Sequence, residues 1–143
     1  MKIAIAADHG GFALKQQLIE HYQKKNVELE DLGTYTPEPV DYPDYGVKMA
    51  RHILDGRADL GIAICGTGVG ISMAANRLKG IRAALLYDDV SAQMAKKHNN
   101  ANIIAFGGRT MAFDDVVRRI DIFLQTEFEG GRHQKRIDKL DEE

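Results

Sequence analysis

The stretch IAICGTGVGIS, residues 62–72, decides the fold of this chain. An apolar run typical of a strand leads into Cys65, the only cysteine, and three glycines follow at alternate positions: Gly66, Gly68 and Gly70. Glycines at this spacing let the backbone turn tightly and expose consecutive N–H groups. A helix then begins, and its positive end joins those N–H groups in favouring an anion such as a phosphate or an enediolate. The stretch predicts a strand, a turn and a helix that hold a thiol beside an anion cradle.

The glycine turn alone does not identify a ligand or a reaction. Dinucleotide-binding proteins carry G-x-G-x-x-G, whereas the spacing here is G-x-G-x-G, and no Gly-Lys-Ser/Thr of a Walker motif follows. Cys65 could act as a thiolate in this environment, or it could be a small buried residue at the end of a strand, which is a common fate of a free cysteine. The stretch by itself leaves both interpretations open.

Short apolar runs alternate with longer amphipathic runs along the rest of the chain. We expect strands at residues 2–7, 27–31, 60–65, 81–86 and 101–106, and helices at residues 11–25, 42–55, 69–78, 90–98 and 113–126. This alternation predicts parallel strands with helices on both faces. Residues 1–143 should therefore form one α/β domain. Its architecture should be a three-layer, doubly wound (Rossmann-like, flavodoxin-like) five-stranded parallel sheet of order 2-1-3-4-5, with a C-terminal helical tail.

The predicted sheet brings two polar turns to one edge. In open α/β sheets, ligands bind outside the carboxyl ends of the strands, near the switch in strand order, which here lies between the first and third strands. Asp8 and His9 end the first strand and Cys65 ends the third, so we expect the two turns to face each other. Asp8 could bind a ligand or cap the next helix, and His9 could bind a ligand or be an exposed loop residue.

Further polar and basic residues follow the later elements. His98 could act as an acid or base at the same carboxyl edge, but its position after a helix, beside Asn99, is also typical of a helix C-terminus. Arg132 and Arg136 are four residues apart, so a helix would put both on one face that matches a phosphate, although an exposed basic turn is the alternative. Arg109 follows the fifth strand and could contact the same anion.

Composition excludes several classes of protein. A net charge of −2 over 143 residues predicts no general attraction to nucleic acid or to an anionic membrane. A single cysteine cannot form an internal disulfide, and no Cys/His spacing typical of zinc sites is present. The apolar run at the N-terminus is too short for a signal peptide, and no run reaches the ~20 apolar residues of a membrane span. We therefore expect a cytoplasmic protein.

Taken together, these motifs resemble those of the type B ribose-5-phosphate isomerases, within a wider family of sugar-phosphate isomerases that includes galactose-6-phosphate isomerase. The resemblance covers nearly the whole chain. It rests on separated motifs in the same order: DHGG at residues 8–11, DYP at 41–43, CGTGVGI at 65–71, SAQ at 91–93, HN at 98–99, GGR at 107–109 and GGRHQ-x-R at 130–136. Several ordered motifs are far more specific than any one of them, which favours the functional interpretation of each.

The resemblance implies an aldose-ketose isomerase that interconverts D-ribose 5-phosphate and D-ribulose 5-phosphate through an enediolate, in the pentose phosphate pathway. Cys65 would move a proton between C1 and C2, and Thr67 and His98 would assist opening of the furanose ring. The remaining residues would bind the substrate. The enediolate oxygens would be held by the backbone N–H groups of Gly66, Gly68, Val69 and Gly70, and the sugar hydroxyls by Asp8 and Asn99. The phosphate would be bound by His9, Arg109, Arg132 and Arg136, and the pocket would be lined by Tyr42. No metal or organic cofactor is implied.

The resemblance also implies a homodimer, or a dimer of such dimers, with active sites shared between subunits. Residues 127–143 have an apolar side, and the double glycine at 130–131 lets the chain leave its own domain. A short helix needs a surface to dock on, which favours docking of this tail on the partner. We expect Arg132 and Arg136 to reach the partner's active site, with His9 as a further candidate.

Two alternatives stay open. Galactose-6-phosphate isomerase divides the key motifs between two different subunits, whereas all of them lie on this one chain, which favours the ribose enzyme. Acceptance of allose 6-phosphate, a longer sugar, is not decided by the sequence.

A non-catalytic phosphate- or nucleotide-binding module of flavodoxin-like shape would explain the glycine turn and the arginines, but not the lone cysteine and two histidines at predicted ligand-binding turns. Such a module would bind its ligand unchanged in Cys65→Ala and show no turnover.

Overall fold

The computed structural model describes residues 1–142 and contains a five-stranded, all-parallel sheet in the order β2-β1-β3-β5-β4. The strands are β1 (Ile3–Ala7), β2 (Leu29–Asp31), β3 (Leu60–Cys65), β4 (Ala83–Leu85) and β5 (Ile103–Gly107). All five predicted strands are present at their expected places along the chain. The predicted α/β class, with helices on both faces of a parallel sheet, is confirmed.

The predicted strand order 2-1-3-4-5 is wrong at one edge, because β5 lies between β3 and β4. Strand β5 pairs with β3 along five residues, from Ile103 opposite Gly61 to Gly107 opposite Cys65. All five residues of β5 are buried, whereas the three residues of β4 are partly exposed. An interior strand of a parallel sheet is covered on both faces and needs a continuous apolar run, while a short strand suits an edge.

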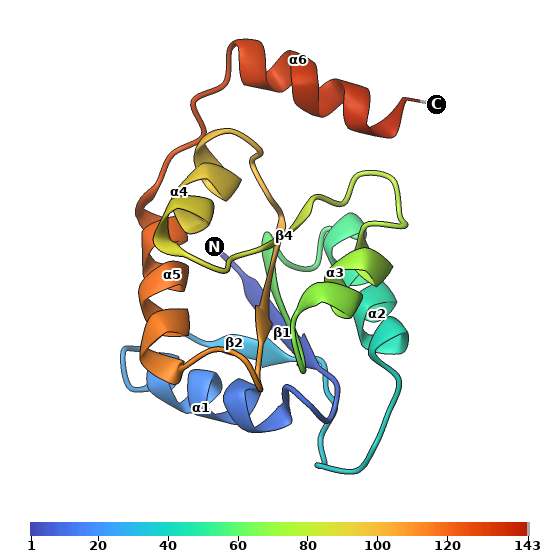
Figure 1. The fold of residues 1–143 in the computed structure, drawn as a ribbon, viewed down its shortest axis with the longest axis vertical. Coiled ribbons are helices and arrows are strands. Elements are labelled where there is room, and N and C mark those ends of the chain that lie inside the picture. The colour runs from blue at the N-terminus through green and yellow to red at the C-terminus, as the bar shows by residue number, and fades with distance from the viewer. Residues whose placement is uncertain (143) are drawn as a thin grey trace.

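The helices are α1 (Phe12–Gln23), α2 (Tyr42–Leu54), α3 (Val69–Ala75), α4 (Asp89–Lys97) and α5 (Phe113–Gln125). Helices α2 and α3 pack on one face of the sheet, and α1, α4 and α5 cover the other (Figure 1). The strand order explains the position of α4. Since crossovers between parallel strands are right-handed, the step back from β4 to β5 places α4 on the same face as α1. Among residues 1–142, no helix is long and apolar enough to cross a membrane.

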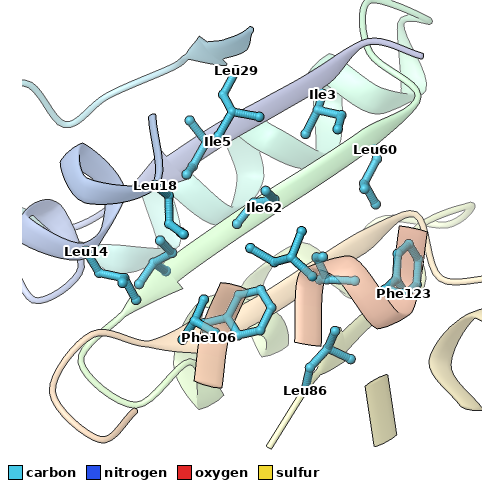
Figure 2. Packing of buried hydrophobic residues seen from close by; sticks show 14 of the residues in the cluster. Ile3, Ile5, Leu14, Leu18, Leu29, Leu60, Ile62, Leu86, Phe106 and Phe123 are labelled. Carbon is cyan, nitrogen blue, oxygen red and sulfur yellow. The ribbon is translucent and has the colours of Figure 1, made fainter. Parts of the chain in front are cut away.

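The two faces of the sheet carry side chains of different size. In β1 the sequence alternates between isoleucine and alanine, so Ile3 and Ile5 point to one face while Ala4 and Ala6 point to the other. The isoleucine face joins Leu18, Phe106 and other large residues under α1 and α5 (Figure 2). The alanine face lets α2 and α3 lie close to the sheet.

The C-terminal tail is helical, as predicted, and comprises α6 (Arg132–Asp138) and a 3₁₀ turn at Lys139–Asp141. His133 and Ile137 are its buried residues, so the tail packs against its own domain. Asp141 Oδ2 accepts the N–H of Gly80 at 3.0 Å, which ties the end of the tail to the loop before β4. Leu140 remains 63% exposed. The expected docking of the tail on a partner stays a prediction.

A buried ion pair joins α1 to the last residue of β2. Lys15 is fully buried, and its Nζ lies 2.8 Å from both carboxylate oxygens of Asp31. Asp31 Oδ1 also accepts the N–H of Gly33 at 2.9 Å. The pair therefore fixes the start of the segment 32–41, whose Val40 contacts His9 near the carboxyl edge of the sheet.

Replacing either partner of this pair should destabilise the fold, but by unequal amounts. Asp31→Asn leaves the ammonium group of Lys15 buried without its counter-ion, so we expect a loss of about 3 kcal/mol in the free energy of unfolding. Lys15→Met leaves a carboxylate whose side chain is 30% exposed and that keeps the Gly33 N–H, so its loss should be smaller. Urea denaturation of the two variants measures the difference. A larger loss in Lys15→Met would contradict this account.

Candidate active site

The loops that follow β1, β3 and β5 meet at the carboxyl edge of the sheet. The N–H of Asp8 donates to the carbonyl of Ile64 at 3.2 Å, and the N–H of Gly108 donates to the carbonyl of Cys65 at 2.8 Å. A Cβ on Gly108 would overlap the carbonyl oxygen of Gly10, so only glycine permits this approach. The prediction that the turns after β1 and β3 face each other is confirmed. Because β5 lies next to β3 in the interior of the sheet, the loop after β5 joins these two turns.

Cys65 is the buried last residue of β3, and the glycine turn wraps around its sulfur. The N–H of Gly68 donates to Cys65 Sγ at 3.2 Å. Gly68 has a φ of 82°, a left-handed conformation that side chains other than glycine rarely adopt. The N–H of Val69 donates to Thr67 Oγ1 at 3.3 Å. The turn therefore holds the thiol and the threonine hydroxyl next to backbone donors, and two of these donors already have acceptors within the turn.

Asp8 and His9 are both held by backbone groups. Asp8 is buried, and its Oδ1 accepts the N–H groups of Gly10 at 2.9 Å and Gly11 at 3.2 Å. Asp8 is not the N-cap of α1, which is Gly11 without a side-chain capping bond; its carboxylate instead holds the turn that leads into the helix. His9 Nδ1 lies 3.1 Å from the backbone nitrogen of Val40, which links the loop after β1 to the segment before α2. Both side chains have fixed positions beside the Cys65 turn.

Tyr42 and Arg109 border the same turn. Tyr42 is the first residue of α2, is 42% exposed, and lies so close to Gly70 that a Cβ there would be 2.7 Å from the tyrosine ring. Arg109 is exposed, and a Cβ on Gly66 would be 3.4 Å from its Nη1. An aromatic ring and a guanidinium group therefore flank the glycine turn at the carboxyl edge.

His98 and Asn99 lie at the opposite, amino-terminal edge of the sheet, so the expectation that His98 shares the carboxyl edge is wrong. His98 caps the end of α4, which runs back across the sheet before β5 begins. The carbonyl of Asn99 accepts from Nε of Arg82, just before β4, at 3.1 Å. The carbonyl of nearby Asn102 accepts the N–H of Gly61 in β3 at 3.0 Å. Figure 1 shows this end of α4 beside α6, far from the start of α1.

The tail helix completes a second group of polar residues at the amino-terminal edge. A cavity of ≈ 330 Å³ is lined by His98, Asn99, Arg132, His133, Arg136, Ile137 and Leu140. The expectation that Arg132 and Arg136 share one face is confirmed, because both line this cavity. The rings of His98 and His133 stack with centroids 4.1 Å apart and an interplanar angle of 12°. Two guanidinium groups and two imidazoles around one cavity suit a phosphate-bearing ligand.

His133 is a residue of this cavity to which sequence reasoning assigned no role. Burial of its ring lowers its pKa, and the adjacent His98, Arg132 and Arg136 lower it further, while Glu129 opposes the shift. The imidazole is therefore biased toward its neutral form. The sequence signal was its position directly after Arg132, in the short helix that also carries Arg136.

The predicted site residues thus form two groups in one chain. The carboxyl-edge group comprises Asp8, His9, Tyr42, Gly66, Thr67, Gly68, Val69, Gly70, Arg109 and Cys65, and the amino-edge group comprises His98, Asn99, Arg132 and Arg136. Strand β5, with five residues at about 3.3 Å per residue, places about 16 Å between the two edges. The thiol and the predicted proton donor do not meet within this chain.

Comparison with known proteins assigns a family. The family described as Ribose/Galactose Isomerase matches residues 3–140. Ribose-5-phosphate isomerase B of Escherichia coli is 43% identical over 97% of this chain and 93% of the relative. A Thermotoga maritima ribose 5-phosphate isomerase structure is 50% identical, with a TM-score of 0.97 over 99% of this chain and 98% of that one.

A solved structure with a sugar phosphate is also similar. Ribose-5-phosphate isomerase B of Mycoplasma genitalium, solved with bound ribulose-5-phosphate, is 42% identical, with a TM-score of 0.91 over 97% of this chain and 93% of that one. The match extends over the sheet, the glycine turn and the tail helix, since both chains are covered almost completely. The chain therefore belongs to the ribose/galactose isomerase family, together with the type B ribose-5-phosphate isomerases.

Proposed function

We propose that this isomerase interconverts D-ribose 5-phosphate and D-ribulose 5-phosphate, the exchange that links these two sugars in the pentose phosphate pathway. The observation that carries the proposal is Cys65, whose sulfur is held in a glycine turn at the carboxyl edge of the sheet. The similar Mycoplasma genitalium protein was solved with ribulose-5-phosphate. A base beside backbone donors is what proton transfer through an enediolate needs, because the donors stabilise the charge that develops on oxygen.

The roles of the carboxyl-edge residues follow from their places in the turn. Cys65, as thiolate, removes the proton from C2 of the aldose and returns it to C1, while the hydroxyl proton passes from O2 to O1, so the base is regenerated. Backbone N–H groups of the glycine turn hold the two oxygens of the enediolate. Thr67 Oγ1 stands at the mouth of the turn, where it assists opening of the furanose ring, and Asp8 binds a sugar hydroxyl. No metal or organic cofactor takes part in these steps.

The amino-edge residues belong to the same reaction but come from a second copy of the chain. His98 donates the proton for ring opening, Asn99 binds a hydroxyl, and Arg132 and Arg136 bind the phosphate with His9 and Arg109. The distance between the two edges supports this homodimeric arrangement.

An exposed apolar surface beside the turn also supports the dimer. Val69 and Met73, one turn apart on α3, are 41% and 64% exposed. Apolar side chains of this size, grouped next to a site, are typical of a surface that a partner covers.

Purified protein should isomerise ribose 5-phosphate without added metal. A coupled assay with ribose 5-phosphate and allose 6-phosphate side by side measures the rate and the preference for the shorter sugar. Treatment with a chelator should leave the rate unchanged, because the thiolate and the backbone dipoles supply the base and the electrophile. Activity that is lost with the chelator and restored by a divalent ion would contradict the mechanism.

Cys65→Ser should keep the fold and substrate binding but lose most of the turnover. An alcohol is a far poorer base than a thiolate at neutral pH, and removal of a general base costs about 100-fold or more. Initial rates and calorimetric titration with ribose 5-phosphate measure the two effects separately. Near-normal isomerisation by the serine variant would show that another group carries the proton.

Subunit exchange between two inactive variants should produce mixed dimers that are active. Cys65→Ala removes the carboxyl-edge base and Arg136→Ala removes an amino-edge phosphate ligand, so a mixed dimer has one site with both defects and one with neither. Activity should appear after unfolding and refolding the two variants together, and each variant refolded alone is the control. If verified heterodimers remain inactive, Cys65 and Arg136 do not serve one site from different chains.

A further inference from the structure

Three metal-ligating side chains converge at the amino-terminal edge. One ligand atom from each of His98, Glu129 and His133 lies within 4.8 Å of the other two. Glu129 Oε1 is 3.7 Å from Nε2 of His133. The backbone N–H of Glu129 donates to the carbonyl of Lys97 at 3.0 Å, which holds the segment before α6 against the end of α4. The three groups thus come from two elements that the backbone fastens together.

His133 supplies an independent indication of a ligand. Its side chain is 6% exposed, and its Nε2 has no hydrogen-bond partner among residues 1–142. Buried polar atoms in proteins normally have a partner, so an unpaired nitrogen that lies within 4.8 Å of a carboxylate oxygen and of a nitrogen of a second imidazole indicates a site.

We propose that His98, Glu129 and His133 bind a divalent transition-metal ion of the Zn²⁺ class and that this binding inhibits the isomerase. Two imidazole nitrogens and one carboxylate oxygen suit Zn²⁺, whereas Ca²⁺ and Mg²⁺ prefer oxygen ligands alone. Three protein ligands leave a fourth tetrahedral position for water. The inhibitory part rests on the proposed function, because metal coordination would occupy the imidazole of His98 that ring opening uses.

Formation of the site needs a small rearrangement. In a tetrahedral zinc site, neighbouring donor atoms lie about 3.4 Å apart, so the three groups must close together and the stacked rings must tilt. Glu129, with a side chain 39% exposed, and His98, only partly buried, have room to move. His133, held within the tail, can stay in place.

The surrounding charges make the ion an inhibitor rather than a resident cofactor. Arg132 Nη1 lies 3.9 Å from Glu129 Oε1, so the guanidinium competes with a metal for the carboxylate. Arg136 lines the same cavity and repels a cation. Both guanidinium groups therefore weaken the binding of a cation, so a permanently bound ion is not expected at this site.

A direct titration tests the binding. Zn²⁺ is titrated against a chromophoric chelator with the Cys65→Ala protein, which removes the thiol as a competing ligand. We expect one ion per chain and a loss of Zn²⁺ affinity of about tenfold or more in Glu129→Gln and in His133→Gln. Replacement of a residue that only hydrogen-bonds to a metal ligand already lowers metal affinity by that much. Glu30→Gln is the matched control, because Glu30 pairs with His52 at 2.6 Å without a third ligand. No binding, or equal affinity in all variants, would overturn the site.

Activity measurements test the inhibition. Zn²⁺ should inhibit chelator-treated wild type reversibly, and Glu129→Gln should keep the basal rate but require about tenfold more Zn²⁺ for half inhibition. Equal sensitivity of Glu129→Gln and wild type would assign the inhibition to another group such as Cys65 and overturn the proposal, as would binding without inhibition. If the metal-free protein does not isomerise ribose 5-phosphate, the proposed function fails, while the titration still decides whether the site exists.

Discussion

The positions of the site residues depend on the close approach of three loops at the carboxyl edge of the sheet. Parallel strands end at the same edge, and the backbone bonds from Asp8 to Ile64 and from Gly108 to Cys65 lock their loops together. This contact is possible only because Gly108 has no side chain facing Gly10. The sulfur of Cys65 therefore has a fixed place relative to Asp8, which is the preorganisation that the proposed proton transfer at a sugar carbon requires.

The fold class and the five strands could be predicted from the sequence, because apolar runs and amphipathic runs alternate clearly. The strand order at the edge could not be taken from the commonest arrangement. Residues 103–107 read IIAFG and residues 83–85 read AAL, so the longer, bulkier run belongs in the interior. Comparison of these two runs would have predicted that β5 neighbours β3. The position of α4 on the face of α1 and α5 follows from the same difference.

The edge of the sheet at which each candidate residue lies was predicted correctly for residues at the ends of strands and wrongly for His98, which follows a helix. Cys65 ends β3, Asp8 and Arg109 come after strands, and all three lie at the carboxyl edge. His98 comes after α4, and a crossover helix runs opposite to its strands, so its end must lie at the amino-terminal edge. The place of α6 was harder to predict, because Gly130 and Gly131 both have positive φ and allow many directions of the chain. Its contact with α4 depends on the stacking of His133 on His98.

Because the candidate site residues lie at two opposite edges of the sheet, the proposed reaction depends on the assembly of two chains. A base at one edge and phosphate ligands at the other cannot hold one small sugar, because the sheet itself separates them by about 16 Å. In a symmetric pair of chains, the carboxyl edge of each can face the amino edge of the other, which gives two complete sites without any change within the chain. The loop contacts and the tail packing each rigidify one half of the site. In the proposed dimer, catalysis then requires that the interface align the two halves, so its geometry matters as much as the turn around Cys65.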